Sequence, residues 1–125
     1  MTNKPLLLSI VELGGYPDFT ASFKRLGFEV ISTDSVRKAV KLIRKNQPSV
    51  IVAEFNFQSD FRDRTSSLET VLSSVQGVAH SKVIVFYEKE VEHQYDRFLA
   101  QFSVHASIPF PIDEVLLEDA LKQTM

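Results

Sequence analysis

Residues 34–54 read DSVRKAVKLIRKNQPSVIVAE, which joins the pattern of an amphipathic helix to that of a buried strand. The apolar face of the helix consists of Val36, Ala39, Val40 and Ile43. We expect Asp34 to cap the start of this helix and Pro48 to end it. The apolar run that follows, Val50–Phe55, does not alternate with polar residues, which is typical of a strand covered on both faces in a parallel sheet.

The same succession of strand and helix patterns extends in both directions along the chain. Further apolar runs predict strands at Leu6–Val11, Phe28–Ser32, Lys82–Tyr87 and Ala106–Phe110. Further stripes at helical spacing are Phe19, Phe23 and Leu26; Leu68, Val71, Leu72 and Val75; Val91, Tyr95, Phe98, Leu99 and Phe102; and Leu116, Leu117, Ala120 and Leu121. Pro17 and Asp113 are expected at helix starts, and Ser66 with Glu69 forms a capping box. Gly27 is expected to end a helix.

Five strand patterns alternating with five helix patterns predict a flavodoxin-like (βα)5 fold of the α/β class. This fold is a three-layer sandwich around a five-stranded parallel sheet with the strand order 2-1-3-4-5. We expect residues 1–125 to form one domain, because a chain of 125 residues has an ordinary domain size. Functional crevices in such sheets lie beyond the carboxyl ends of the strands. The residues of interest there are Glu12, Glu54, Tyr87 and Phe110.

The composition excludes several classes of function. The chain contains no cysteine, which rules out a disulfide scaffold, a thiolate metal site and a cysteine nucleophile. Its formal net charge is −2, so no overall positive field gathers nucleic acid or anionic lipid. No apolar run approaches the ~20 residues of a membrane span, and the first residues lack the pattern of a signal peptide. We expect a cytoplasmic protein without nucleic-acid or membrane partners.

Two stretches of the sequence resemble the receiver domains of bacterial two-component response regulators. The stretch Asp34–Glu54 is similar to the family's second helix, the turn after it and the third strand. The segment Phe110-Pro111-Ile112-Asp113-Glu114 is similar to the family's Lys-Pro-Phe motif followed by an acidic residue. The likeness spans nearly the whole chain and consists of element order, length and patterning. It implies the same flavodoxin-like fold.

The family's phosphoryl-transfer residues are largely replaced. Receivers hold Mg²⁺ with acids after the first strand and accept the phosphoryl group on an aspartate of the third, assisted by a Ser/Thr of the fourth and a lysine of the fifth. The corresponding residues here are Glu12, Glu54, Tyr87 and Phe110. The longer side chain of Glu54 moves the carboxylate by roughly 1.5 Å, and such a displacement costs on the order of 100-fold in rate.

The resemblance therefore implies a degenerate receiver, or pseudo-receiver, that is not an enzyme and needs no Mg²⁺. Glu12 and Glu54 are the only candidates for a weak metal site. For Glu54, a solvated acid at a strand end is favoured over a permanent mimic of a phosphoryl group. Ser107 stands at the position of the family's aromatic switch residue, while Tyr87 carries the large ring. We therefore expect the surface of the fourth helix and fifth strand to be held in one state.

The function most consistent with these features is a stand-alone, phosphorylation-independent protein–protein interaction module in signal transduction. We expect contacts through the fourth helix, fifth strand and fifth helix, with a homodimer as one form of such contact. A second expected contact is the loop after the third strand, with Phe57, Phe61, Arg62 and Arg64. One alternative is a phosphoacceptor that uses a non-standard acid with Mg²⁺. Another is a small-ligand-binding domain, which a pocket with converging polar groups would favour.

Overall fold

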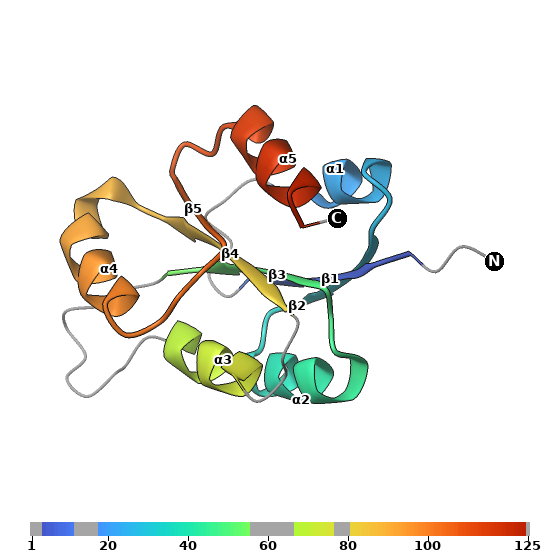
Figure 1. The fold of residues 1–125 in the computed structure, drawn as a ribbon, viewed down its shortest axis with the longest axis horizontal. Coiled ribbons are helices and arrows are strands. Elements are labelled where there is room, and N and C mark those ends of the chain that lie inside the picture. The colour runs from blue at the N-terminus through green and yellow to red at the C-terminus, as the bar shows by residue number, and fades with distance from the viewer. Residues whose placement is uncertain (1–3, 12–17, 56–66, 77–80, 125) are drawn as a thin grey trace.

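The computed structural model describes residues 4–11, 18–55, 67–76 and 81–124. These residues form a five-stranded parallel sheet with helices on both faces (Figure 1). The strands are β1 (Leu6–Ile10), β2 (Glu29–Thr33), β3 (Val50–Glu54), β4 (Lys82–Tyr87) and β5 (Ala106–Pro109). The helices are α1 (Thr20–Arg25), α2 (Val36–Asn46), α3 (Ser67–Gln76), the short 3₁₀ helix η1 (Lys89–Val91), α4 (Glu92–Leu99) and α5 (Glu114–Lys122). The strand order β2-β1-β3-β4-β5 confirms the predicted topology.

The helix boundaries confirm part of the capping prediction and correct another part. Asp113 caps α5, because its carboxylate accepts hydrogen bonds from the Val115 and Leu116 amides. The prediction that Asp34 caps α2 is wrong. Ser35 does so, since it has the extended backbone of a cap and its hydroxyl accepts from the Lys38 amide three residues later.

Glycine ends α1 as predicted. Gly27 has a φ of 100°, a conformation that residues with a Cβ rarely adopt, and its amide donates to the Lys24 carbonyl. At the start of α1, the structure places the first helical residue at Thr20. The predicted starts at Pro17 and Ser66 lie outside the described residues.

Consecutive residues of each strand face two different hydrophobic layers. In β3, Ile51 and Ala53 pack beneath α2, α3 and α4, whereas Val50 and Val52 pack beneath α1 and α5. Val50 and Ile51, which face opposite layers, are both fully buried. This burial on both faces explains why the strand segments of the sequence are continuously apolar.

Polar contacts hold α1 and α5 together over their shared face of the sheet. The Ser22 hydroxyl donates to the Glu114 carboxylate, and the Arg25 guanidinium lies 3.1 Å from a Glu118 carboxylate oxygen. The two helices are neighbours in Figure 1 although they stand at opposite ends of the chain. Within the described ranges, no helix is both long and apolar enough to cross a bilayer.

The apolar stripe of α5 is narrower than predicted. Leu117, Ala120 and Leu121 are buried, but Leu116 is 53% exposed and its neighbour Val115 is 65% exposed. Residues 117, 120 and 121 share one helix face, whereas position 116 is rotated from it by about 100°. Including Leu116 in the buried face was therefore wrong, and two large apolar side chains remain on the surface of α5.

Two adjacent leucines of α5 provide a matched test of this packing. We expect Leu117→Ala to lower the free energy of unfolding by about 2–5 kcal/mol, because it empties a fully buried position. Leu116→Ala changes the same side chain at an exposed position and should stay within about 0.5 kcal/mol of the unmodified protein. Urea unfolding followed by circular dichroism measures both. Equal losses from the two substitutions would contradict the assigned orientation of α5.

Candidate functional site

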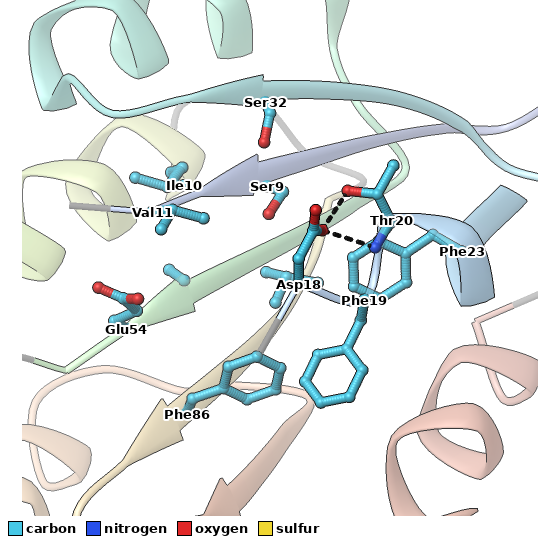
Figure 2. A pocket seen from close by; sticks show the side chains of 12 residues that line it. Ser9, Ile10, Val11, Asp18, Phe19, Thr20, Phe23, Ser32, Glu54 and Phe86 are labelled. Atoms are coloured by element: carbon cyan, nitrogen blue, oxygen red, sulfur yellow. Dashed lines mark hydrogen bonds between the residues drawn. The ribbon is translucent and has the colours of Figure 1, made fainter. Parts of the chain in front are cut away.

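A cavity of about 480 Å³ opens where the carboxyl ends of β1 and β3 meet the start of α1 (Figure 2). Its described lining consists of Ser9, Ile10, Val11, Asp18, Phe19, Thr20, Phe23, Ser32, Val52, Ala53, Glu54 and Phe86. The cavity therefore lies at the edge of the sheet where the strand order predicts a functional crevice.

Glu54 is the last residue of β3, and its side chain borders the cavity. The residue is only 4% exposed, so the expectation of a solvated strand-end acid is wrong. The reason is its position in the strand. Glu54 follows the alternation of Val50 and Val52 and thus belongs to the face covered by α1 and α5.

Phe86 is the residue beside Glu54 at the cavity. The two are register partners in neighbouring strands, and Phe86 is 4% exposed. Its ring meets that of Phe19 edge to face, with centroids 5.9 Å apart. Sequence reasoning selected Tyr87 for this place, one position further along β4. Side chains alternate between the two faces of a strand, so Phe86 lies on the same face as Ile84 and borders the cavity, whereas Tyr87 lies on the other face.

Asp18 is a second acid at the cavity that the sequence analysis did not select. Its carboxylate accepts hydrogen bonds from the Thr20 amide at 2.9 Å and the Thr20 hydroxyl at 2.6 Å, which Figure 2 shows as dashed lines. These hydrogen bonds lower the pKa of the Asp18 carboxyl below its usual value. The signal in the sequence was an aspartate two residues before a threonine at a helix start.

Tyr87 faces the opposite side of the sheet from the cavity. Its ring stacks on Tyr95 of α4, with centroids 4.6 Å apart and planes inclined by 23°. Tyr95 is 1% exposed, and its hydroxyl lies 2.6 Å from the Ser107 hydroxyl on β5. Ser107, which stands at the predicted switch position, is therefore hydrogen-bonded to the ring hydroxyl of Tyr95 on α4. Burial raises the pKa of the Tyr95 hydroxyl to about 12.

The remaining predicted site residues are not gathered at the cavity by the described part of the structure. Phe110 follows β5, is 36% exposed, and its amide donates to the Tyr87 carbonyl at 2.8 Å. Glu12, together with the loop residues Phe57, Phe61, Arg62 and Arg64, lies outside the described residues. Their roles stay predictions.

A magnesium site of the receiver type needs several oxygen ligands around one point. Nowhere in residues 4–11, 18–55, 67–76 and 81–124 do three His, Asp or Glu side chains come together to hold a metal ion. The described neighbours of Glu54 at the cavity include the apolar side chains of Val52 and Phe86. The described residues therefore do not fit such a site, and we derive no chemical step through the ion.

Comparison with known proteins identifies the fold. No protein-family model and no curated protein matches the chain. Among solved structures, chemotaxis protein CheY4 of Vibrio cholerae is similar with a TM-score of 0.75 and 13% identity, covering 98% of this chain and 100% of that one. A response regulator receiver protein of Pseudomonas putida has a TM-score of 0.69 and 15% identity, and the match covers 98% of this chain and 99% of that one. The signal receiver domain of a Luxo repressor protein from Vibrio parahaemolyticus has a TM-score of 0.71 and 16% identity, and the match covers 98% of this chain and 90% of that one.

The chain thus has the fold of response-regulator receiver domains, as the resemblance in its sequence implied. The likeness in three dimensions extends over nearly the full length of the chain. At these identities it establishes the architecture and leaves the chemistry of the strand ends to the residues themselves.

The buried Tyr95 hydroxyl gives the protein a specific response to alkali. The unfolded chain releases this proton near the ordinary pKa of 10.0, whereas the folded chain keeps it to about 12. The folded state therefore binds more protons between these values, and the free energy of unfolding should fall as pH rises through this range. Tyr95→Phe should reduce that decline, as measured by urea unfolding at successive pH values. Parallel declines in both proteins would show that Tyr95 is not the responsible group.

Proposed function

We propose that this chain is an atypical receiver domain that acts by protein–protein contact in signalling and does not depend on phosphorylation. The receiver fold supports the signalling role, since the similar structures include a chemotaxis protein and response regulators. We further propose that it acts in the cytoplasm without Mg²⁺ and without catalysing a reaction. Its surface, and not a turnover step, would then carry the signal.

The observation that carries this proposal is the chemistry of the described strand ends. Phosphoryl transfer needs a positioned nucleophile together with cations that absorb charge on the phosphoryl oxygens. Here the acid at the end of β3 is a buried glutamate with Phe86 as its register partner, and β5 is followed by Phe110. The longer side chain of Glu54 and the apolar rings of Phe86 and Phe110 support the proposal that this site no longer carries out phosphoryl transfer.

The contacts of Tyr95 support a receiver surface that stays in one state. Switching in receivers requires an aromatic side chain to move between two positions near the fourth and fifth strands. In this chain Tyr95 is packed between neighbouring rings, with Phe55 at 5.0 Å and Tyr87 at 4.6 Å, while its hydroxyl bonds Ser107. Moving it would break this part-buried hydrogen bond and separate the rings in the same step.

Phosphorylation independence predicts a negative result with a small phosphodonor. After incubation with acetyl phosphate and Mg²⁺, intact-protein mass spectrometry should show no acid-sensitive species heavier by about 80 Da, the mass of a phosphoryl group. A receiver that retains its aspartate and lysine, treated in parallel, serves as the positive control. Stoichiometric labelling of this chain would overturn the proposal, and its loss in Glu54→Gln would identify Glu54 as the acceptor.

We propose that the face formed by α4, β5 and α5 is the contact surface, with a second copy of the chain as its first candidate partner. Val115 and Leu116, adjacent in α5, are the most exposed large apolar residues in the described part of the chain, and Phe110, which is 36% exposed, precedes α5 in the sequence. We call these three residues the α5 patch. Large apolar side chains exposed next to one another are typical of interaction sites.

A charge placed in the α5 patch should disrupt this association. If the protein dimerises through the patch, Leu116→Lys should shift it toward the monomer, because a lysine cannot be desolvated there without cost. Val11→Lys is the matched control, since Val11 is also exposed, at 37%, but lies at the end of β1. Sedimentation velocity over a range of concentrations measures the change. A dimer that survives Leu116→Lys would exclude the patch, and a wild-type monomer at all concentrations would exclude the homodimer.

A further inference from the structure

We propose that the exposed face of α2 is a docking surface for an acidic segment of another protein, in which aspartate or glutamate side chains stand next to an apolar residue. This inference goes beyond the proposed function, because α2 and α5 cover opposite faces of the sheet (Figure 1). The contact therefore stands or fails independently of the α5 patch. It rests on the charges of α2, on the groove beside this helix and on the acidic balance of the rest of the chain.

The positive charge of this protein is concentrated on one helix. Five of the fourteen Lys and Arg residues lie in α2, whereas none of the sixteen Asp and Glu residues does. At about 100° per residue, these cations fall within about 120° of the helix circumference, opposite the buried Ala39 and Ile43. All five are exposed: Arg37, Lys38, Lys41, Arg44 and Lys45.

The cations of α2 form no ion pair with any residue that the structure describes. Arg25 of α1, in contrast, is paired with Glu118. Like charges one turn apart repel each other, as Arg37 and Lys41 do. Arg37 and Lys38 also stand in the first turn, where cations oppose the helix macrodipole. Because an exposed helix face usually mixes both signs of charge, this face carries a cost that an acidic partner would relieve.

A groove beside α2 supplies an apolar contact. It has a volume of about 490 Å³ and lies between α2 and the carboxyl ends of β1 and β2. Its lining includes Leu42 and Lys38, one turn apart on α2, and the exposed Val11 that follows β1. The rest of its described lining consists of Ser32, Thr33 and Asp34, so the cations of α2 outnumber the acid of the groove. A segment along α2 can place an apolar side chain against Leu42 while its acids meet the cations.

The orientation of α2 favours a protein partner over a membrane. A helix that binds at a membrane surface inserts its apolar face between the lipids. The apolar face of α2 is not available for this, because Ala39 and Ile43 are fully buried against the sheet. Only its cations and the neighbouring groove are presented to a partner.

The short length of the basic face favours a peptide over a nucleic acid. α2 has 11 residues and is about 16 Å long. The whole chain has a formal net charge of −2, so the part outside α2 is net acidic. A nucleic acid that continued past the helix would be repelled there, since every nucleotide adds a negative charge. An extended peptide of about five residues covers the same length at about 3.3 Å per residue.

Four probes offered to the full chain test the nature of the partner. They are a peptide of about ten residues with aspartate and glutamate around a central leucine, the same peptide with asparagine and glutamine in place of its acids, an oligothymidylate of about the same length, and vesicles of equal parts phosphatidylcholine and phosphatidylserine. Fluorescence anisotropy measures the first three, and co-sedimentation measures the vesicles.

We expect the acidic peptide to bind about tenfold more tightly than the neutral one, because several exposed ion pairs act together. NaCl raised from about 0.1 M to about 1 M should remove most of this difference, since the Debye length falls from about 10 Å to about 3 Å. Replacing the central leucine by glycine should weaken binding about fivefold through the loss of apolar contact. Equal affinity for both peptides would overturn the proposal, as would tighter binding of the oligonucleotide or the vesicles.

Matched substitutions locate the contact. Lys41→Gln combined with Arg44→Gln removes two charges from the face of α2 and should weaken the acidic peptide about fivefold. The control combines Arg97→Gln on α4 with Lys122→Gln on α5, two exposed positions, and makes the same change in net charge. It should leave the affinity within about twofold. Equal losses in the two double variants would mean attraction by net charge alone and would contradict the proposal. Circular dichroism verifies the fold of each variant, and the probe comparison requires none.

Discussion

The inner strands β1, β3 and β4 are covered on both faces, so each step along one of them moves the side chain from one hydrophobic layer to the other. At the carboxyl ends this alternation has chemical consequences. Glu54 and Phe86 point toward the layer of α1 and α5, while Tyr87 belongs to the layer of α4. Two adjacent residues of β4 therefore serve two separate parts of the molecule, the cavity and the packing of α4.

The cavity combines buried polar residues, an exposed acid and aromatic rings. A buried glutamate, a buried serine and an aspartate held by Thr20 share one space with the rings of Phe19 and Phe86. Burial of an acid in an apolar wall is costly, and a protein tolerates such cost mainly where the group has a role. The receiver fold provides the location at the strand ends, and the side chains there determine which chemistry that location can carry.

Much of the fold was predictable from the sequence, because strand and helix periods depend on local spacing. The continuous run at Val50–Phe55 predicted a two-sided strand, and all five strand segments were found within one residue of their observed ends. The cap at Ser35 and the outward turn of Leu116 depend on rotation by a single position, which composition does not reveal. The site was harder still, since Phe86 meets Phe19 and Tyr95 meets Ser107 across the packing of helices on the sheet. Of the residues that the sequence singled out, Glu54 lines the cavity, whereas Phe110 is not part of its described lining.

The hydroxyl pair of Tyr95 and Ser107 also has a mechanical consequence. β5 lies at one edge of the sheet, and the pair ties this edge to α4 through a contact that is shielded on the helix side. A displacement of α4 relative to the sheet would have to break this hydrogen bond and separate the stacked rings of Tyr95 and Tyr87 together, so the two contacts oppose sliding jointly.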